Sequence, residues 1–256
     1  MRVTFLGTGT SYGIPMPGCD CATCRSPDPR DRRFRTAILV EADDAALLID
    51  TPPDLRSQCL AHGIRRIDGV LMTHGHADHV FGFDDLRAYT NRMPEPMPVW
   101  ASAGTAATLR KIFDYLDLPP IPGTSLARID LRAVEGPFEF RGFRLTPLPA
   151  EHGRADMIGW KIERAGRALV AIPDCKFLPP ETLALCRGVD LAAIDALRIR
   201  PHPTHMNFDE AAAALREIGA RRSLVLHLCH EVSHAQAERL LPAGMAPAYD
   251  GLQIEL

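Results

Sequence analysis

Four potential metal ligands stand within six positions of the chain, in the segment Thr73-His74-Gly75-His76-Ala77-Asp78-His79. Imidazole and carboxylate groups suit divalent cations such as Zn²⁺, Mn²⁺ or Fe²⁺. His74 and His76 can project together from an extended segment, whereas Asp78 and His79 would begin the next helix and point elsewhere. The segment therefore predicts ligands for two neighbouring cations, although any one of these residues alone would be read as a solvated side chain in a turn.

Three further candidate ligands each end or follow an apolar strand pattern: His152, Asp174 and His227. Taken singly, each is also consistent with a helix cap, a turn former or a histidine of the core. Taken together, they supply the ligands that the first segment lacks for two metal ions.

A second group of ligands lies near the N-terminus, where Cys19-x-Cys21-x-x-Cys24 offers three thiolates to a zinc ion. His230, three residues after His227, is the fourth ligand that we expect, and Cys229 is the second choice. A closed, thiolate-rich tetrahedral site is structural rather than catalytic. Three free cysteines, or a redox pair of Cys21 and Cys24, are the other interpretations.

Bulk properties narrow the class of protein. The chain has 256 residues, 46% hydrophobic and 24% charged, with a net charge of -3 that offers no basic field to a nucleic acid. No apolar stretch approaches the roughly 20 residues of a membrane span, and no signal-peptide pattern opens the chain. Seven cysteines cannot all pair within the chain. We expect one domain over residues 1–256, with reduced thiols, in the cytoplasm.

Strands must carry most of these residues. The pattern predicts strands at Arg2–Leu6, Ala37–Glu41, Ala46–Asp50, Val70–Thr73, Phe143–Thr146, Ile158–Glu163, Ala168–Ile172, Leu191–Ile194 and Ser223–His227. It predicts helices at Pro53–His62, His79–Asn91, Gly104–Leu116, Pro179–Arg187, Asn207–Ile218 and Ser233–Leu241, the fifth with a capping box. Two sheets covered outside by helices accommodate this order.

Three segments are predicted to be loops. The proline-rich stretches Met93–Pro98 and Leu118–Pro122 are surface loops, because regular patterns resume after each. The glycine-rich segment Gly7–Gly13 lacks the lysine of a phosphate-binding P-loop, so it predicts a tight turn after the first strand.

The His-x-His-x-Asp-His element, followed by a later His, Asp and His at strand ends, resembles the metallo-β-lactamase superfamily over nearly the whole chain. The resemblance implies a four-layer αβ/βα sandwich of the α/β class. It implies one metal on His74, His76 and His152, a second on Asp78, His79 and His227, and Asp174 bridging them. Asp50 matches an early aspartate that supports the ligand loop, while Pro52 stands close to where the family often carries glycine.

The three-cysteine loop together with His227-x-x-His230 resembles a narrower branch, the phosphodiesterases of phosphonate degradation that hydrolyse phosphoribosyl 1,2-cyclic phosphate. That resemblance implies a small phosphodiester substrate, a homodimer, and a histidine that assists catalysis, which matches His205. His205 is otherwise a surface histidine near a helix N-cap, and His202 is the weaker candidate.

The expected mechanism uses two divalent cations, Mn²⁺ or Zn²⁺ with Fe²⁺ as a third choice, that lower the pKa of a shared water for attack on phosphorus. Asp78 would help to hold this nucleophile, and His205 would donate a proton to the leaving oxygen. Arginines such as Arg87, Arg198 and Arg200 fit either a phosphate contact or the protein surface, so they are given no role.

Other functions fit the same ligand set. A tRNA 3′-processing nuclease would need a long basic arm, which the sequence lacks. A thioesterase or lactonase would need no further motif. A non-catalytic carrier, like the B component of pyrroloquinoline quinone synthesis, shares the three-cysteine loop but has a degenerate ligand set.

Overall fold

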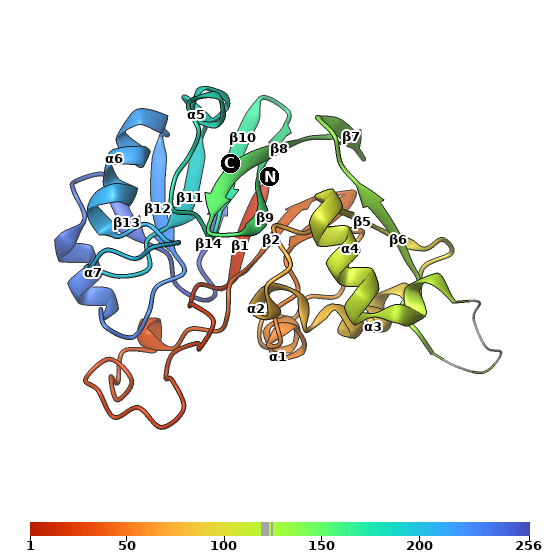
Figure 1. The fold of residues 1–256 in the computed structure, drawn as a ribbon, viewed down its shortest axis with the longest axis horizontal. Helices are drawn as coiled ribbons and strands as arrows, with labels where there is room; N and C mark the ends of the chain where they lie inside the picture. The colour runs from red at the N-terminus through yellow and green to blue at the C-terminus, as the bar shows by residue number, and fades with distance from the viewer. Residues whose placement is uncertain (119–122, 124) are drawn as a thin grey trace.

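The structure is a computed structural model that describes residues 1–118, 123 and 125–256. Two sheets of seven strands each pack face to face, and helices cover the outer face of both (Figure 1). The predicted four-layer αβ/βα sandwich is therefore confirmed. The two termini lie side by side, where β1 pairs with β14.

The first sheet has the strand order β14-β1-β2-β3-β4-β5-β6. Its strands are β1 (Arg2–Gly7), β2 (Ala37–Ala42), β3 (Ala45–Ile49), β4 (Gly69–Leu71), β5 (Met97–Ala101), β6 (Ile129–Ala133) and β14 (Gln253–Glu255). Its outer face is covered by α1 (Leu55–Ala61), α2 (Ala77–Val80), α3 (Arg87–Thr90) and α4 (Ala103–Ile112) (Figure 1).

The second sheet has the order β13-β12-β11-β10-β9-β8-β7. Its strands are β7 (Phe138–Phe140), β8 (Phe143–His152), β9 (Ala155–Arg164), β10 (Arg167–Ile172), β11 (Leu191–Asp195), β12 (Arg222–Leu226) and β13 (Met245–Pro247). Helices α5 (Pro180–Cys186), α6 (Phe208–Ile218) and α7 (His234–Leu240) cover its outer face (Figure 1). The predicted capping box of α6, between Asn207 and Glu210, is present.

Burial of both faces of each sheet explains why the strands read as continuous apolar runs. In β10, Leu169 and Ala171 belong to the cluster between the sheets, whereas Val170 and Ile172 belong to the cluster beneath the helices. Trp160 on β9 is fully buried, and its indole N–H donates to the Met72 carbonyl at 3.1 Å. This bond fixes the second sheet to the end of β4, directly before the histidine-rich segment.

The predicted helix over residues 79–91 is wrong in its extent. It is divided into α2, a 3₁₀ turn (Phe83–Leu86) and α3. The break lies at Gly82, whose N–H donates to the Thr51 carbonyl at 2.9 Å. A Cβ at Gly82 would lie 2.1 Å from the Pro52 oxygen, so the chain bends here to pack against the Asp50–Pro52 turn.

The predicted loop at Met93–Pro98 is wrong at its end, because Met97 and Pro98 begin β5. Pro98 is tolerated because it pairs only with Asp130 of β6, before the pairing with β4 starts at Val99. Strands β5, β6, β7, β13 and β14 were not predicted. Leu118 is exposed, and the rest of the second proline-rich stretch, residues 119–122, lies outside the described residues.

Other helix boundaries differ from the prediction by at most four residues, and a 3₁₀ turn (Asp114–Asp117) follows α4. The glycine-rich segment after β1 is a turn as predicted, with Gly13 at φ 64° and its N–H bonded to the Thr10 carbonyl at 2.8 Å. None of the helices in the described residues combines the length and the apolar character of a membrane span.

Candidate metal centre

The carboxyl ends of six strands from both sheets meet at one edge of the sandwich. β3 and β4 run parallel in the first sheet, and β10, β11 and β12 run parallel in the second, with β8 in the same direction. The seven predicted ligands of the two-metal site lie after β4, at the end of β8, and after β10 and β12. The topology therefore brings together residues that are up to 153 positions apart (227 − 74).

His74, His76 and His152 form the first group of ligands. His74 Nε2 lies 2.9 Å and His152 Nε2 lies 3.3 Å from His76 Nδ1. All three nitrogens lie within 4.8 Å of one another. Three convergent imidazole nitrogens, with His76 exposed on one side, could hold a cation with an open position.

Asp78, His79 and His227 form the second group with Asp174, again with ligand atoms within 4.8 Å of one another. His79 Nε2 lies 3.5 Å from Asp78 Oδ2 and 3.3 Å from Asp174 Oδ1. His227 Nδ1 lies 3.2 Å from the same Asp174 oxygen.

Asp174 stands between the two groups with one oxygen toward each. Its Oδ1 faces His79 and His227, while its Oδ2 lies 3.9 Å from His74 Nε2 and 3.8 Å from His152 Nε2. The side chain is 2% exposed. This is the arrangement that a carboxylate bridging two cations requires.

Neighbouring groups fix the orientation of the ligands. The imidazole of His79 donates from Nδ1 to Asp50 Oδ2 at 2.7 Å, and His152 donates from Nδ1 to the Thr204 carbonyl at 2.8 Å. Asp50 also accepts the Thr73 N–H at 2.8 Å and the Thr73 hydroxyl at 2.7 Å. These bonds leave the Nε2 atoms of both histidines free to face the site.

The backbone is strained at two of these positions. Asp50 has φ 61° and His227 has φ 60°, which is the left-handed region that non-glycine residues rarely adopt. Each residue directly follows a strand, β3 and β12 respectively. Strain of this kind persists where the surrounding structure imposes it, and it is concentrated at functional sites.

The electrostatics of the site favour metal binding. Burial, and then the neighbouring His79, hold the pKa of His74 well below its usual range, and burial lowers the pKa of His227 to about 3. Both rings are therefore neutral and keep a lone pair for a metal. Burial opposes the protonation of His79, but Asp174, Asp50 and Asp78 together raise its pKa, which shows how strongly this pocket of carboxylates attracts positive charge.

Two polar atoms at the centre of the site lack partners. His79 Nε2 and Asp174 Oδ1 are fully buried, and although they lie 3.3 Å apart, neither makes a well-aligned hydrogen bond to any residue that the structure describes. Buried polar atoms are almost always satisfied in folded proteins. The residues present therefore fit the divalent cations that the fold implies, because a cation between these two atoms would satisfy both.

His205 lies beside the metal-ligand cluster, between His152 and His227. Its ring centroid is 4.6 Å from that of His152 and 5.1 Å from that of His227, on which it stacks. Its Nδ1 lies 2.7 Å from Asp195 Oδ2. Burial opposes the protonated ring, but the attraction of Asp195 prevails and raises the pKa of His205.

Asp195 was not predicted as a site residue. It ends β11, is fully buried, and also accepts the Cys175 N–H at 2.9 Å. Burial raises its pKa to about 7. The signal that could have found it is the one that marks Asp174 and His227, a polar residue at the carboxyl end of an apolar strand.

The other residues considered from the sequence, His202 and three arginines, are not part of the metal-ligand cluster. His202 is half-buried, and its ring centroid is 5.0 Å from that of His205. Arg87 pairs with Asp84, and Arg198 and Arg200 pair with Glu231. These three arginines are therefore engaged with acidic neighbours.

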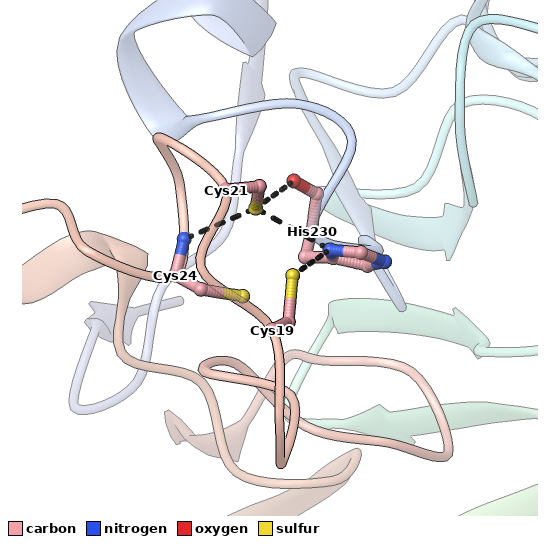
Figure 2. Close-up of side chains that lie close together, drawn as sticks. All are labelled: Cys19, Cys21, Cys24 and His230. Atoms are coloured by element: carbon pink, nitrogen blue, oxygen red, sulfur yellow. Dashed lines mark hydrogen bonds between the residues drawn. The ribbon is translucent and has the colours of Figure 1, made fainter.

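The cysteine cluster is a second group of potential ligands. Figure 2 shows Cys19, Cys21 and Cys24 of the N-terminal loop around His230, with the four ligand atoms within 4.8 Å of one another. His230 Nδ1 lies 3.3 Å from Cys19 Sγ and 3.4 Å from Cys21 Sγ. A hydrogen bond from the Cys24 N–H is the main cause that lowers the pKa of Cys21 to about 6, which favours a thiolate.

Cys229 is buried and does not belong to this cluster, and all seven cysteines are free of disulfides. The fit to zinc is good, because three sulfurs and one imidazole nitrogen make up a set of four ligands of the kind that structural zinc sites use. Such an ion would fasten the loop of residues 19–24 to the segment after His227.

Comparisons with known proteins agree with this geometry. A family model described as Beta-lactamase superfamily domain matches residues 46–228. The crystal structure of a new diphosphatase from the PhnP family is 36% identical, with a TM-score of 0.91 over 100% of this chain and 97% of that one.

Two other relatives are informative. An octanoyltransferase of Porphyromonas gingivalis is 35% identical over 99% of this chain, which spans only 51% of that protein. Zn²⁺-bound PqqB from Methylobacterium extorquens matches with a TM-score of 0.80 and 24% identity, over the full length of both chains, which is a likeness of fold.

Proposed function

The chain belongs to the β-lactamase superfamily as a metal-dependent hydrolase, and from this premise we propose that it hydrolyses a small or cyclic phosphodiester at a two-metal centre. The observation that carries the proposal is Asp174, whose two oxygens face two separate groups of ligands. The similarity to a PhnP-family diphosphatase over the whole chain supports phosphorus as the reacting atom.

The ligand roles that we propose follow the geometry. His74, His76 and His152 would hold one divalent cation, Asp78, His79 and His227 the other, and Asp174 would bridge them. When bound, such cations lower the pKa of a water to give a nucleophile near neutral pH and neutralise charge on the phosphate oxygens. Mn²⁺ and Zn²⁺, with Fe²⁺ as a further choice, suit imidazole and carboxylate ligands.

His205 is the proposed proton donor. Its Nδ1 is held by Asp195, which leaves Nε2 free toward the site as a donor to the leaving oxygen. Asp195 would act as a positioning residue, because it fixes the ring and favours the protonated form. Asp78, whose side chain is 13% exposed and lies beside His79, would help to orient the nucleophile while it binds metal.

A closed zinc site on Cys19, Cys21, Cys24 and His230 is proposed as structural. Because its four ligands come from both ends of the chain, it would stabilise the edge of the sandwich next to the metal-ligand cluster. Neither a nucleic acid nor a membrane is proposed as a partner.

Two other substrate classes have specific support. The PhnP-family relative is a diphosphatase, which favours a diphosphate diester as the second candidate. The octanoyltransferase relative brings acyl chemistry into consideration, although this chain matches only about half of that protein. Both classes belong in the first assay.

The test is metal-dependent hydrolysis of bis(p-nitrophenyl) phosphate, a dinucleoside diphosphate, a thioester and a β-lactam. Metal-free protein would be resupplied with Mn²⁺ or Zn²⁺, with Asp174→Ala as the inactive variant. Asp190→Ala is a matched control, because Asp190 precedes β11 at the opposite end of the same sheet.

Diester hydrolysis that is restored by metal, lost in Asp174→Ala and kept in Asp190→Ala would support the proposal. Turnover of the thioester or lactam with no turnover of either phosphorus substrate would overturn it.

A further inference from the structure

A cavity of about 480 Å³ opens directly beside the first group of ligands. His76 and His152 form one side of it. The turn between β8 and β9, the first turn of α4 and Thr204 form the others. Its size is that of a small-molecule site, so it would receive the part of a substrate that extends away from the cleaved bond.

Arg154 is the only cationic residue that lines this cavity among the described residues. Its side chain is exposed, and its guanidinium makes no hydrogen bond or ion pair within the described part of the chain. The guanidinium groups of Arg87, Arg198 and Arg200, in contrast, each pair with an acidic residue. A guanidinium presents a planar fork of donors that matches carboxylate and phosphate groups.

The one acidic residue that lines the cavity is already engaged. Asp156 Oδ2 accepts the Gly104 N–H at 2.9 Å, in the first turn of α4. Its negative charge is therefore placed at the positive end of a helix dipole. Among the described residues, Arg154 is therefore the charged side chain of this cavity that has no partner.

The position of Arg154 is fixed relative to the metal ligands. It stands two residues after His152, in a turn where Gly153 has φ 59°. A Cβ at Gly153 would lie 2.8 Å from Thr204 Cγ2, so the turn packs closely on the residue whose carbonyl holds His152. An anion bound by Arg154 would therefore lie at a defined place relative to the cleaved bond.

We propose that Arg154 is a specificity-determining residue that binds a second anionic group, a phosphate or a carboxylate, on the part of the substrate that is not cleaved. The proposal rests on the proposed function, because it assigns the reacting phosphate to the metal-ligand cluster.

Binding to the Mn²⁺-loaded protein tests the proposal by calorimetry with two product-like probes, thymidine 3′,5′-bisphosphate and thymidine 5′-monophosphate. The wild type should prefer the bisphosphate, and Arg154→Gln should weaken that nucleotide alone by about 10- to 100-fold, the contribution of a charge-assisted hydrogen bond. Arg154→Lys should restore part of the affinity for the bisphosphate that Arg154→Gln loses.

Arg144→Gln is the matched control, because Arg144 is also exposed on β8, at its other end, and has no ion pair in the described structure. It should bind both nucleotides as the wild type does. Three outcomes would each overturn the proposal: Arg154→Gln loses affinity equally for both nucleotides, the wild type binds the bisphosphate no more tightly than the monophosphate, or the wild type binds neither nucleotide.

Measurements of turnover test the role of Arg154 separately from the proposed phosphodiesterase function. The p-nitrophenyl ester of thymidine 5′-phosphate would be compared with the same ester that also carries a 3′-phosphate. A lower KM for the second ester, lost in Arg154→Gln, would support Arg154 as the determinant. No hydrolysis of either ester, together with the predicted binding preference, would overturn the phosphodiesterase function and leave the anion site supported.

Discussion

At the scale of single residues, the site is defined by pairs in which one side chain orients another. Asp50 holds His79, the Thr204 carbonyl holds His152, and Asp195 holds His205. In each pair the Nδ1 atom is occupied and Nε2 remains for the chemistry. The pairs differ in the role that we propose for the free nitrogen. Nε2 of His79 and of His152 would bind a metal ion, whereas Nε2 of His205 would donate a proton to the leaving group.

His205→Ala tests the third pair. The variant should slow esters with poor leaving groups by about 10²–10⁴-fold more than activated nitrophenyl esters, because a good leaving group needs no proton. Asp195→Asn should show the same dependence of kcat on the leaving group, with a smaller loss of kcat than His205→Ala. The measurement is kcat over a series of diesters of graded leaving-group pKa.

His202→Ala is the control for this series, since the His202 ring lies next to that of His205 but its Nδ1 accepts the Thr204 N–H and does not contact Asp195. Its kcat should stay near the wild-type value across the series. A uniform loss over all esters in His205→Ala would remove the proton-donor role.

Asp50→Asn tests the first pair. An amide cannot accept all three hydrogen bonds that Asp50 accepts from Thr73 and His79, so the His79 ring would lose its fixed orientation. Mn²⁺ affinity should fall by about 10–100-fold, as for other residues that support metal ligands. Calorimetric titration of metal-free protein measures this.

Asp68→Asn provides the comparison, because Asp68 is a buried aspartate at the other end of β4 that accepts the Ala46 N–H. This variant should keep wild-type metal affinity whatever its stability. Unchanged affinity in Asp50→Asn would show that the backbone alone orients His79.

The ligands could be predicted from sequence because each is a polar residue that follows an apolar strand, and because four of them are adjacent. Of their supporting groups, only Asp50 was expected, from the family resemblance. The Thr204 carbonyl carries no side-chain signal. Asp195 carries the same signal as the ligands, a polar residue at the end of an apolar strand, but its link to His205 is formed only in the folded chain. The roles of all these residues stay predictions until metal binding is measured.

At the scale of helices and strands, the site depends on strand ends that arrive at one edge. The strands were predicted where both faces are apolar, as in β10 and β11, and missed where they are short or half-exposed, as in β7 and β14. Likewise, the break at Gly82 follows from contact with Pro52, which no local pattern reveals.

Gly159 on β9 shows how closely these strands pack. A Cβ there would lie 2.5 Å from Ile172 Cγ1 and 2.9 Å from the Ala171 carbonyl oxygen, on the neighbouring strand β10. Gly159→Ala should therefore lower the free energy of unfolding by about 1–3 kcal/mol, the usual cost of overpacking. Urea denaturation would measure it.

Gly136→Ala is the matched control, because a Cβ at Gly136 would meet nothing within 4 Å. Its free energy of unfolding should be equal to that of the wild type or slightly higher. Equal stability of both variants would mean that β9 and β10 can separate at little cost.

At the scale of the whole molecule, both ligand clusters join distant parts of the chain. The two-metal cluster takes four ligands from the end of the first sheet and three from the second, and the cysteine cluster joins residues 19–24 to His230. Metal binding at either cluster would therefore stabilise the packing of segments that are far apart in sequence, beyond its role in chemistry.

Removal of metal should accordingly lower Tm in two separable steps. At a free metal concentration of about 100 times Kd, binding adds about 2.7 kcal/mol, or roughly 5–10 °C for a chain of this size. Mn²⁺ disfavours thiolates, so it should raise Tm through the two-metal cluster alone, whereas Zn²⁺ should act at both clusters.

Thermal denaturation of metal-free protein would measure this. The Tm of Asp174→Ala should rise with Zn²⁺ but not with Mn²⁺, and the Tm of Cys24→Ser should rise with Mn²⁺ as that of the wild type does. Identical Tm responses of the two variants would mean that the clusters do not bind metal independently. An unchanged Tm of the wild type on addition of metal would mean that metal binding does not stabilise the fold.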